Sequence, residues 1–217
     1  MTAKHAILDR LASALGRPVT EGNTEPVGAV DIPREYRTTS DMGETERIEL
    51  LTDRLVDYDA GVYEVPLTQV PQKVAELLGD AANIVVPHDL EAGWTEKTEA
   101  KVLQDSRDEP LSIDELDSVD AVVTGATVAI ADTGTICLAG EHTGRRAITL
   151  VPDHHIIVLK KKDICTIVPE GIAVLEARGL VTAPQTWVSG PSASVDIEFQ
   201  RVAGVHGPRT LDVIITD

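Results

Sequence analysis

The chain has 217 residues, a formal net charge of −17, 42% hydrophobic residues and only 3% aromatic residues. This excess of acid argues against binding to nucleic acid, because a surface that displaces counterions from phosphates is built from Lys and Arg. No apolar stretch reaches the roughly 20 residues that a membrane span requires, and the first residues lack the basic and apolar regions of a secretory signal. We therefore expect a cytoplasmic protein with a core of Val, Ile, Leu and Ala.

The first 60 residues are predicted to contain two amphipathic helices. Apolar residues recur at helical spacing over residues 1–16 and again over 40–59. Residues 17–33 are rich in Pro and Gly, which is typical of a linker. We divide the chain into an N-terminal helix with its linker, residues 1–40, and an α/β domain, residues 41–217. The apolar stripe of the first helix needs a covering surface, and self-association into a homo-oligomer is one way to provide it.

Beyond the second helix, short aliphatic strands alternate with helices. The predicted strands are residues 62–65, 83–86, 120–123, 127–131, 135–138, 147–151, 155–159 and 211–216. The predicted helices are residues 67–78, 112–116, 170–178 and 195–201. Most of the segment 87–118 shows no regular period. This alternation favours an α/β fold with a largely parallel sheet and helices on both faces.

The first of three candidate binding loops contains Thr133, Gly134 and Thr135. It lies between two predicted strands. A glycine there lets backbone amides approach an anion, and the flanking hydroxyls add donors. The alternative is a plain hairpin turn in which Asp132 caps its own backbone.

The second candidate loop contains Gly190, Ser192 and Ser194, just before the predicted helix 195–201. Amides and hydroxyls would converge there near the positive end of a helix dipole, an arrangement that binds phosphate or carboxylate groups. Ordinary N-capping by a serine explains the same residues. Both interpretations stay open at this point.

The third candidate loop places His206 between glycines, followed by Gly207 and Arg209. His206 could act as a general acid or base, or hydrogen-bond a ligand. A lone loop histidine is more often a surface or turn residue. The guanidinium of Arg209 could pair with a ligand carboxylate or with the acidic surface of the protein.

Metal binding and the common nucleotide-binding loops are not expected. His142 does not stand in the two-histidine helical spacing of zinc hydrolases, and His154 and His155 would point to opposite faces of a strand. Cys137 and Cys165 are too few for a disulfide scaffold or for the four thiolates of an iron–sulfur cluster. The sequence contains no Gly-x-Ser-x-Gly, Gly-x-Gly-x-x-Gly or Walker A pattern.

A resemblance to the LUD-domain (lactate-utilisation) family runs in order through four segments: VTGATVAIADTGTICL, TLVPDHHIIVL, IVPEGIAVLEA and SGPSASVDIEFQRVAGVHGPRTLDVIITD. It covers about residues 60–217, and SGPSxSxDIE followed by GVHGPR is its most specific part. It implies a NagB/RpiA/CoA-transferase-like fold. It also implies a role in oxidising L-lactate to pyruvate beside two iron–sulfur subunits. The chain is similar to the short branch of the family, so clusters are expected in the partner subunits and no cofactor in this chain.

The resemblance also places the family's motif positions on the three loops. We expect these loops to meet at the carboxyl ends of the strands, where open α/β sheets bind ligands. Amides of the first two loops would then hold a small anionic ligand. His206 and Asp196 are the candidate catalytic residues: His206 would hydrogen-bond or exchange a proton with the ligand, and Asp196 would orient a donor.

Three functions are weighed on this basis. The first is an accessory or substrate-binding subunit of the lactate-oxidising system, inactive alone, and whether it is itself an enzyme stays open. The second is a stand-alone isomerase or acyl/CoA-transferase-like enzyme acting on a phosphorylated or CoA-linked metabolite, which rests on analogy of fold. The third is a non-catalytic binding protein whose glycine loops are only tight turns.

Overall fold

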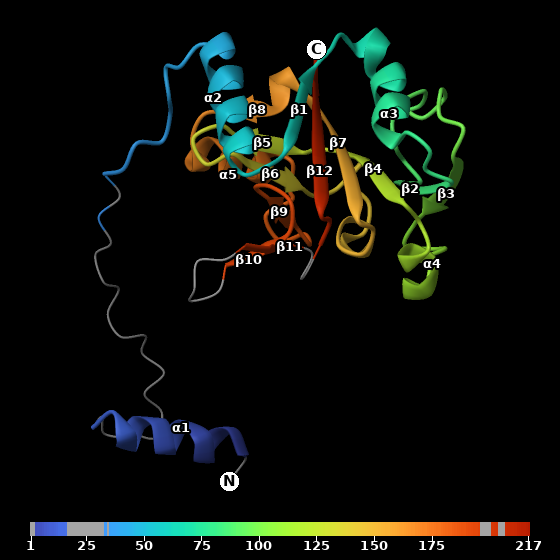
Figure 1. Cartoon of the computed structure of the whole chain (residues 1–217). Helices are drawn as coiled ribbons and strands as arrows, with labels where there is room; N and C mark the ends of the chain where they lie inside the picture. The colour runs from blue at the N-terminus through green and yellow to red at the C-terminus, as the bar shows by residue number, and fades with distance from the viewer. Residues whose placement is uncertain (1–2, 17–32, 34, 196–200, 204–206) are drawn as a thin grey trace. The chain divides into compact units, whose positions relative to one another are not determined.

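The structure is a computed structural model that describes residues 3–16, 33, 35–195, 201–203 and 207–217. The chain divides into two compact units, Met1–Tyr36 and Arg37–Asp217. The first unit contains the predicted N-terminal helix, α1 (Ala3–Ala14). The predicted linker, except for residue 33, lies outside the described residues. All elements described below belong to the second unit (Figure 1).

A six-stranded sheet forms the centre of the second unit. Its spatial order is β1 (Gly61–Glu64), β12 (Thr210–Thr216), β7 (His154–Lys160), β4 (Ala121–Gly125), β2 (Asn83–Pro87) and β3 (Lys101–Asp105). Every neighbouring pair is parallel. All carboxyl ends of the strands therefore lie at one edge of this main sheet, and all amino ends at the other.

A second, mixed sheet packs against one face of the main sheet. Its order is β8 (Ile164–Cys165), β5 (Val128–Ile130), β6 (Thr135–Leu138) and β9 (Thr186–Val188). Ile136 and Leu138 of β6 share a buried cluster with Ile157 and Val213 of the main sheet. A separate antiparallel pair joins β10 (Ala193–Val195) to β11 (Arg201–Ala203).

Helices cover both faces of the main sheet, as the sequence predicted (Figure 1). One face packs against α3 (Val70–Leu78). The other packs against α2 (Glu44–Asp57) beside the second sheet, and against α4 (Ile113–Asp117). The helix α5 (Val168–Ala177) covers the outer side of the second sheet. The short 3-10 helices are η1 (Leu67–Gln69), η2 (Arg146–Thr149) and η3 (Lys161–Asp163).

The pattern of apolar residues explains why these helices pack as they do. In α2, Ile48, Leu51 and Leu55 are buried at helical spacing, and Glu44 and Glu46 stand in the first turn, where the helix dipole favours acid. Within the described residues, no helix has the length and apolar character needed to cross a membrane.

Two predicted elements need correction, and further strands were not predicted. Residues 147–151 form no strand: η2 occupies 146–149, and Ile148 is buried against the main sheet. The strand β3 was missed, because it is a largely exposed edge strand with polar residues. The predicted helix 195–201 is wrong at both ends, since residue 195 ends β10 and residue 201 begins β11. Residues 196–200 lie outside the described residues.

Candidate functional site

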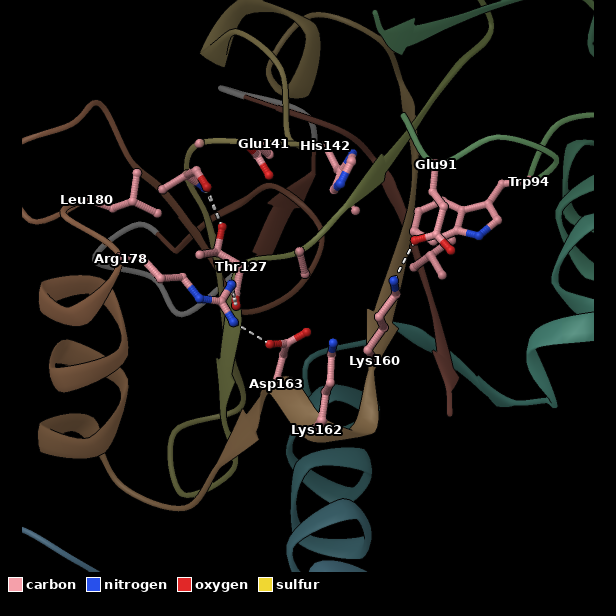
Figure 2. A pocket seen from close by; sticks show the side chains of 15 residues that line it. Glu91, Trp94, Thr127, Glu141, His142, Lys160, Lys162, Asp163, Arg178 and Leu180 are labelled. Atoms are coloured by element: carbon pink, nitrogen blue, oxygen red, sulfur yellow. Dashed lines mark hydrogen bonds and ion pairs between the residues drawn. The ribbon is translucent and has the colours of Figure 1, made fainter. Parts of the chain in front are cut away.

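A cavity of about 490 Å³ lies at the carboxyl edge of the main sheet (Figure 2). It is reached by the ends of β4 and β7 and by the loop that follows β6. Open parallel sheets usually bind ligands at this edge. The lining side chains labelled in Figure 2 are Glu91, Trp94, Thr127, Glu141, His142, Lys160, Lys162, Asp163, Arg178 and Leu180.

Two of the three cationic side chains in this carboxyl-edge cavity are already neutralised. Lys160 Nζ lies 2.5 Å from Glu91 Oε2. Arg178 donates to Asp163 Oδ1 at 2.6 Å and to the Thr127 carbonyl at 3.0 Å. Lys162 is exposed, and within the described part of the chain no carboxylate lies within ion-pair distance of its amine. Lys162 is therefore the lining cation that is available to a ligand.

His142 is held in the cavity by an uncommon backbone conformation. Its φ is 61°, in the left-handed region that residues other than glycine seldom adopt. Its amide donates to Asp89 Oδ2 at 2.9 Å, and its carbonyl accepts from the Gly125 amide at 2.7 Å. Such local strain is often found at binding sites.

The hydrogen bonds of His142 also fix its tautomer. Nδ1 lies in hydrogen-bond contact with the carbonyl oxygen of Asp89. A carbonyl can only accept, so Nδ1 carries the hydrogen, and Nε2 of the neutral ring has the lone pair. Nε2 can then accept a hydrogen bond or a proton from a ligand in the cavity.

Apolar side chains complete the wall. Trp94 is buried, and its ring centroid is 6.0 Å from Lys160 Nζ. Val158 and Leu180 add further apolar surface. An apolar wall with a few convergent polar groups is typical of sites for small organic molecules, and the free amine of Lys162 favours an anionic one.

The predicted second and third loops do not lie at this edge. Gly207 and Pro208 precede the first residue of β12, so they lie at the amino edge of the main sheet. The Ser192 amide donates to the Pro208 carbonyl at 2.7 Å and joins the second loop to the third. The expectation that the loops meet at the carboxyl ends is therefore wrong. They meet at the opposite edge, because the third loop leads into β12 rather than out of it.

The first loop is the turn of the β5–β6 hairpin. Thr133 is exposed, whereas Gly134 is buried with a φ of 60°. Thr135 Oγ1 lies 2.9 Å from Ser189 Oγ, so this loop contacts the second loop. The structure thus brings the three predicted loops together at the amino edge.

A second cavity, of about 170 Å³, lies among these loops. Of the predicted ligand-binding residues, Gly190, Ser192 and Gly207 line it. Thr133, Gly134, Thr135 and Arg209 are not among its lining residues. Arg209 is instead exposed and pairs with Asp153 at 3.0 Å. Ser194 lies in β10, where its backbone is in register with residue 202 of β11.

Asp196 and His206, the two predicted catalytic residues, lie outside the described residues. Their assignment stays a prediction.

The two neighbouring histidines of β7 point to opposite faces, as strand alternation predicted. His154 Nε2 lies 2.7 Å from Asp212 Oδ2 on the α3 side, and His155 Nε2 lies 2.8 Å from Thr124 Oγ1 on the other. In the described ranges, no three His, Cys, Asp or Glu residues gather in a way that could hold a metal ion.

Sequence reasoning missed the side chains of the carboxyl-edge cavity. Glu91 and Trp94 fall in the segment without a regular period, and a charge partner for Lys160 at a separation of 69 residues has no local signal. One signal was present in the run of three lysines that begins at the last residue of the aliphatic strand β7. The carboxyl end of a buried parallel strand is the place where such a run can enter a ligand site.

The comparisons with known proteins agree with this fold. The family model of the LUD domain matches residues 49–216. Lactate utilization protein C of Deinococcus radiodurans is 42% identical over 183 residues, covering 83% of this chain and 84% of that protein. Its namesake from Shouchella clausii is 26% identical over 225 residues, covering 99% of this chain and 97% of that protein.

One solved structure is also similar. The crystal structure of a DUF162 family protein from Deinococcus radiodurans matches with a TM-score of 0.69 and 36% identity, covering 81% of this chain and 99% of that one. The resemblance seen in the four sequence segments is confirmed by these matches. The chain belongs to the LUD domain family.

Proposed function

We propose that this chain is an accessory or substrate-binding subunit of an iron–sulfur system that oxidises L-lactate to pyruvate. The observation that carries the proposal is the 42% identity to a protein named Lactate utilization protein C over 83% of this chain. Identity at this level over most of both chains supports a shared role as well as a shared fold.

The carboxyl-edge cavity supports the binding of a small 2-hydroxy or 2-oxo acid. Its available cation is Lys162, which can pair with a carboxylate. The lone pair at His142 Nε2 can accept a hydrogen bond from the 2-hydroxyl group. The apolar side chains of Trp94 and Leu180 suit the methyl group of lactate.

The two cysteines support the placement of the redox centres in partner subunits. Burial raises the pKa of the Cys137 thiol to about 11. Burial, together with the charge of Glu170, also raises the pKa of Cys165 to about 11. Without a metal both groups are therefore thiols at neutral pH, and two cysteines are fewer than the four thiolates that usually hold an iron–sulfur cluster.

The test of the subunit role is an affinity purification of the tagged full chain from its own cells grown on L-lactate. We expect iron-containing, cysteine-rich proteins to copurify together with lactate-oxidising activity, and the isolated chain to be inactive. A chain that is recovered alone, without iron or activity, would contradict the proposal. Turnover by the isolated chain would instead favour a stand-alone enzyme.

The test of the cavity is the variant Lys162→Ala. Loss of the available cation should weaken binding of L-lactate or pyruvate by the isolated chain by about two- to fivefold, the effect of losing one exposed charge pair of roughly 0.5–1 kcal/mol. Isothermal titration calorimetry measures this affinity directly. Lys97→Ala is the matched control, because Lys97 is exposed and does not line the cavity. Equal affinities of both variants would contradict the assignment of Lys162.

A further inference from the structure

His155 is a buried histidine, and one of its two ring nitrogens has no hydrogen-bond partner among the described residues. The residue is completely buried, and its Nε2 lies 2.8 Å from Thr124 Oγ1. Among the residues that the structure describes, its Nδ1 has no hydrogen-bond partner. A buried polar atom without a partner is uncommon and destabilising. Nδ1 of His155 therefore needs a partner that the described residues do not supply.

The smaller cavity at the amino edge offers the place for such a partner. His155 lines this amino-edge cavity of about 170 Å³ together with Gly190, Ser192 and Gly207. The two loops that carry these small residues are joined by the hydrogen bond from the Ser192 amide to the Pro208 carbonyl, 2.7 Å long. The cavity therefore has a defined wall on the side opposite the sheet.

The second loop is also fixed from outside the cavity. Gly190 has a φ of 151°, and a Cβ placed there would lie 2.9 Å from the Tyr58 carbonyl oxygen. Ser189 Oγ lies 2.9 Å from Thr135 Oγ1 of the β5–β6 turn. Close packing against the end of α2 and a hydrogen bond to the first loop thus hold the cavity wall in place. A preformed wall reduces the entropic cost of binding a ligand.

The lining of the amino-edge cavity selects an uncharged ligand. None of its described lining residues is Asp, Glu, Lys or Arg, and Leu150, Val188 and Leu211 make part of the surface apolar. Burial, with a smaller effect from His154, lowers the pKa of His155 to about 3, so the ring is neutral at physiological pH. A neutral imidazole has one donor and one acceptor nitrogen, and the Thr124 contact uses Nε2.

We propose that the amino-edge cavity binds a small uncharged organic molecule whose hydroxyl group hydrogen-bonds to Nδ1 of His155. A hydroxyl group fits either tautomer of the ring, because it can donate to an acceptor nitrogen and accept from a donor nitrogen. This site is separate from the carboxyl-edge cavity assigned above to a 2-hydroxy or 2-oxo acid. It does not depend on that proposed function.

The experiment is a titration of the full chain, labelled with ¹⁵N-histidine, followed by NMR of the ring nitrogens. The probes are L-lactamide, which is uncharged and carries a hydroxyl group, and L-lactate, its anionic counterpart. We expect L-lactamide to shift the His155 nitrogen signals saturably while leaving those of the exposed His88 unchanged. L-lactate should act at the His155 nitrogens about tenfold more weakly, because no Lys or Arg stands among the described residues that line this cavity.

Two variants separate this site from the rest of the protein. Leu150→Trp fills the amino-edge cavity from its partly exposed side and should weaken the effect of L-lactamide by about tenfold. Leu67→Trp, at a similarly exposed position outside the cavity, should leave this effect unchanged. Lys162→Ala should also leave it unchanged, so a failure here is distinguishable from a failure of the proposed function.

The proposal is overturned if L-lactamide leaves the His155 signals unshifted, or if Leu150→Trp binds it as well as the unaltered chain does. It is also overturned if L-lactate acts at His155 as strongly as L-lactamide. A crystal soaked with L-lactamide that shows only water at Nδ1 would have the same meaning.

Discussion

Gly134, in the turn between β5 and β6, combines two constraints that only glycine meets. Its φ of 60° lies in the left-handed region, and a Cβ would lie 2.6 Å from the Cβ of Arg54 on α2. Gly179, which follows α5, has a similar φ of 68°, but a Cβ added there would have no atom within 4 Å. The two glycines therefore separate the cost of backbone strain from the cost of packing.

We expect Gly179→Ala to lower the free energy of unfolding by about 1 kcal/mol, the cost of a left-handed alanine. Gly134→Ala should lower it by about 2–4 kcal/mol, because overpacking against Arg54 is added to the same strain. Urea unfolding of the two variants beside the unaltered chain measures both values. Equal losses would show that the turn moves away from α2 at little cost.

At this scale the sequence predicted several residues that the structure brings together, and their role in binding stays a prediction. Gly190, Ser192 and Gly207 do gather around one cavity, and their small size was the signal. His155 was considered only as a metal ligand, because nothing in a sequence says that one of its nitrogens will lack a partner. Lys162 became a candidate only once its neighbours Lys160 and Arg178 were seen to be paired.

The start of α5 depends on the carboxylate of Glu170. Its Oε2 accepts from the Thr166 amide at 2.8 Å and the Ile167 amide at 3.1 Å, and its Oε1 accepts from the Ser40 amide at 2.8 Å. Burial acts to raise the pKa of Glu170, but these hydrogen bonds outweigh burial and lower it below its ordinary value. The side chain of Glu170 thus accepts hydrogen bonds from two backbone amides at the start of α5 and from one amide in the segment that precedes α2.

Protonation of Glu170 should therefore destabilise the protein in acid. Because its pKa is lower in the folded chain, the stabilisation is complete above the unfolded pKa and is lost as pH falls through the folded pKa. At pH 7, Glu170→Gln should lower the free energy of unfolding by about 1 kcal/mol, and this difference should shrink as pH falls below about 4, the ordinary range of a glutamate pKa. Urea unfolding across this pH range is the measurement. Glu176→Gln, exposed at the far end of α5, is the control and should show no such trend.

The elements that sequence reasoning missed share a physical cause. Residues 147–151 resemble a strand because a short apolar run has the same composition in a buried strand and in a buried 3-10 turn. The strand β3 has mostly exposed side chains, so its polar sequence resembles a loop. The pairing of β10 with β11 is a contact between separate segments. In each case the element depends on burial or on strand pairing, and the local sequence pattern shows neither.

The whole second unit is organised around its central strands. The strands β7 and β12 are buried and have a parallel neighbour on each side, whereas β3 is an edge strand with exposed side chains. The predicted parallel sheet with helices on both faces is confirmed at this scale. Aliphatic runs and a low aromatic content were enough to indicate it, but the strand order depends on contacts that no local pattern contains.

Native-state hydrogen exchange should reflect this difference in burial between the central strands and the edge strand. Amides of Ile156–Leu159 and of Val213–Ile215 should exchange only on global unfolding, because they lie in the most buried strands. Amides of β3 should exchange by local opening, at rates about 100-fold faster or more, equivalent to roughly 3 kcal/mol or more. Mass spectrometry or NMR can measure both. Equal protection of β3 and β7 would show that the edge strand does not open by itself.

The order of strands along the chain has a further consequence. The second sheet takes β5 and β6 from the chain between β4 and β7, and β8 and β9 from the chain between β7 and β12. No single continuous piece of sequence encodes either sheet. A genetic recombination event with one junction in this region therefore cannot exchange one sheet and leave the other intact.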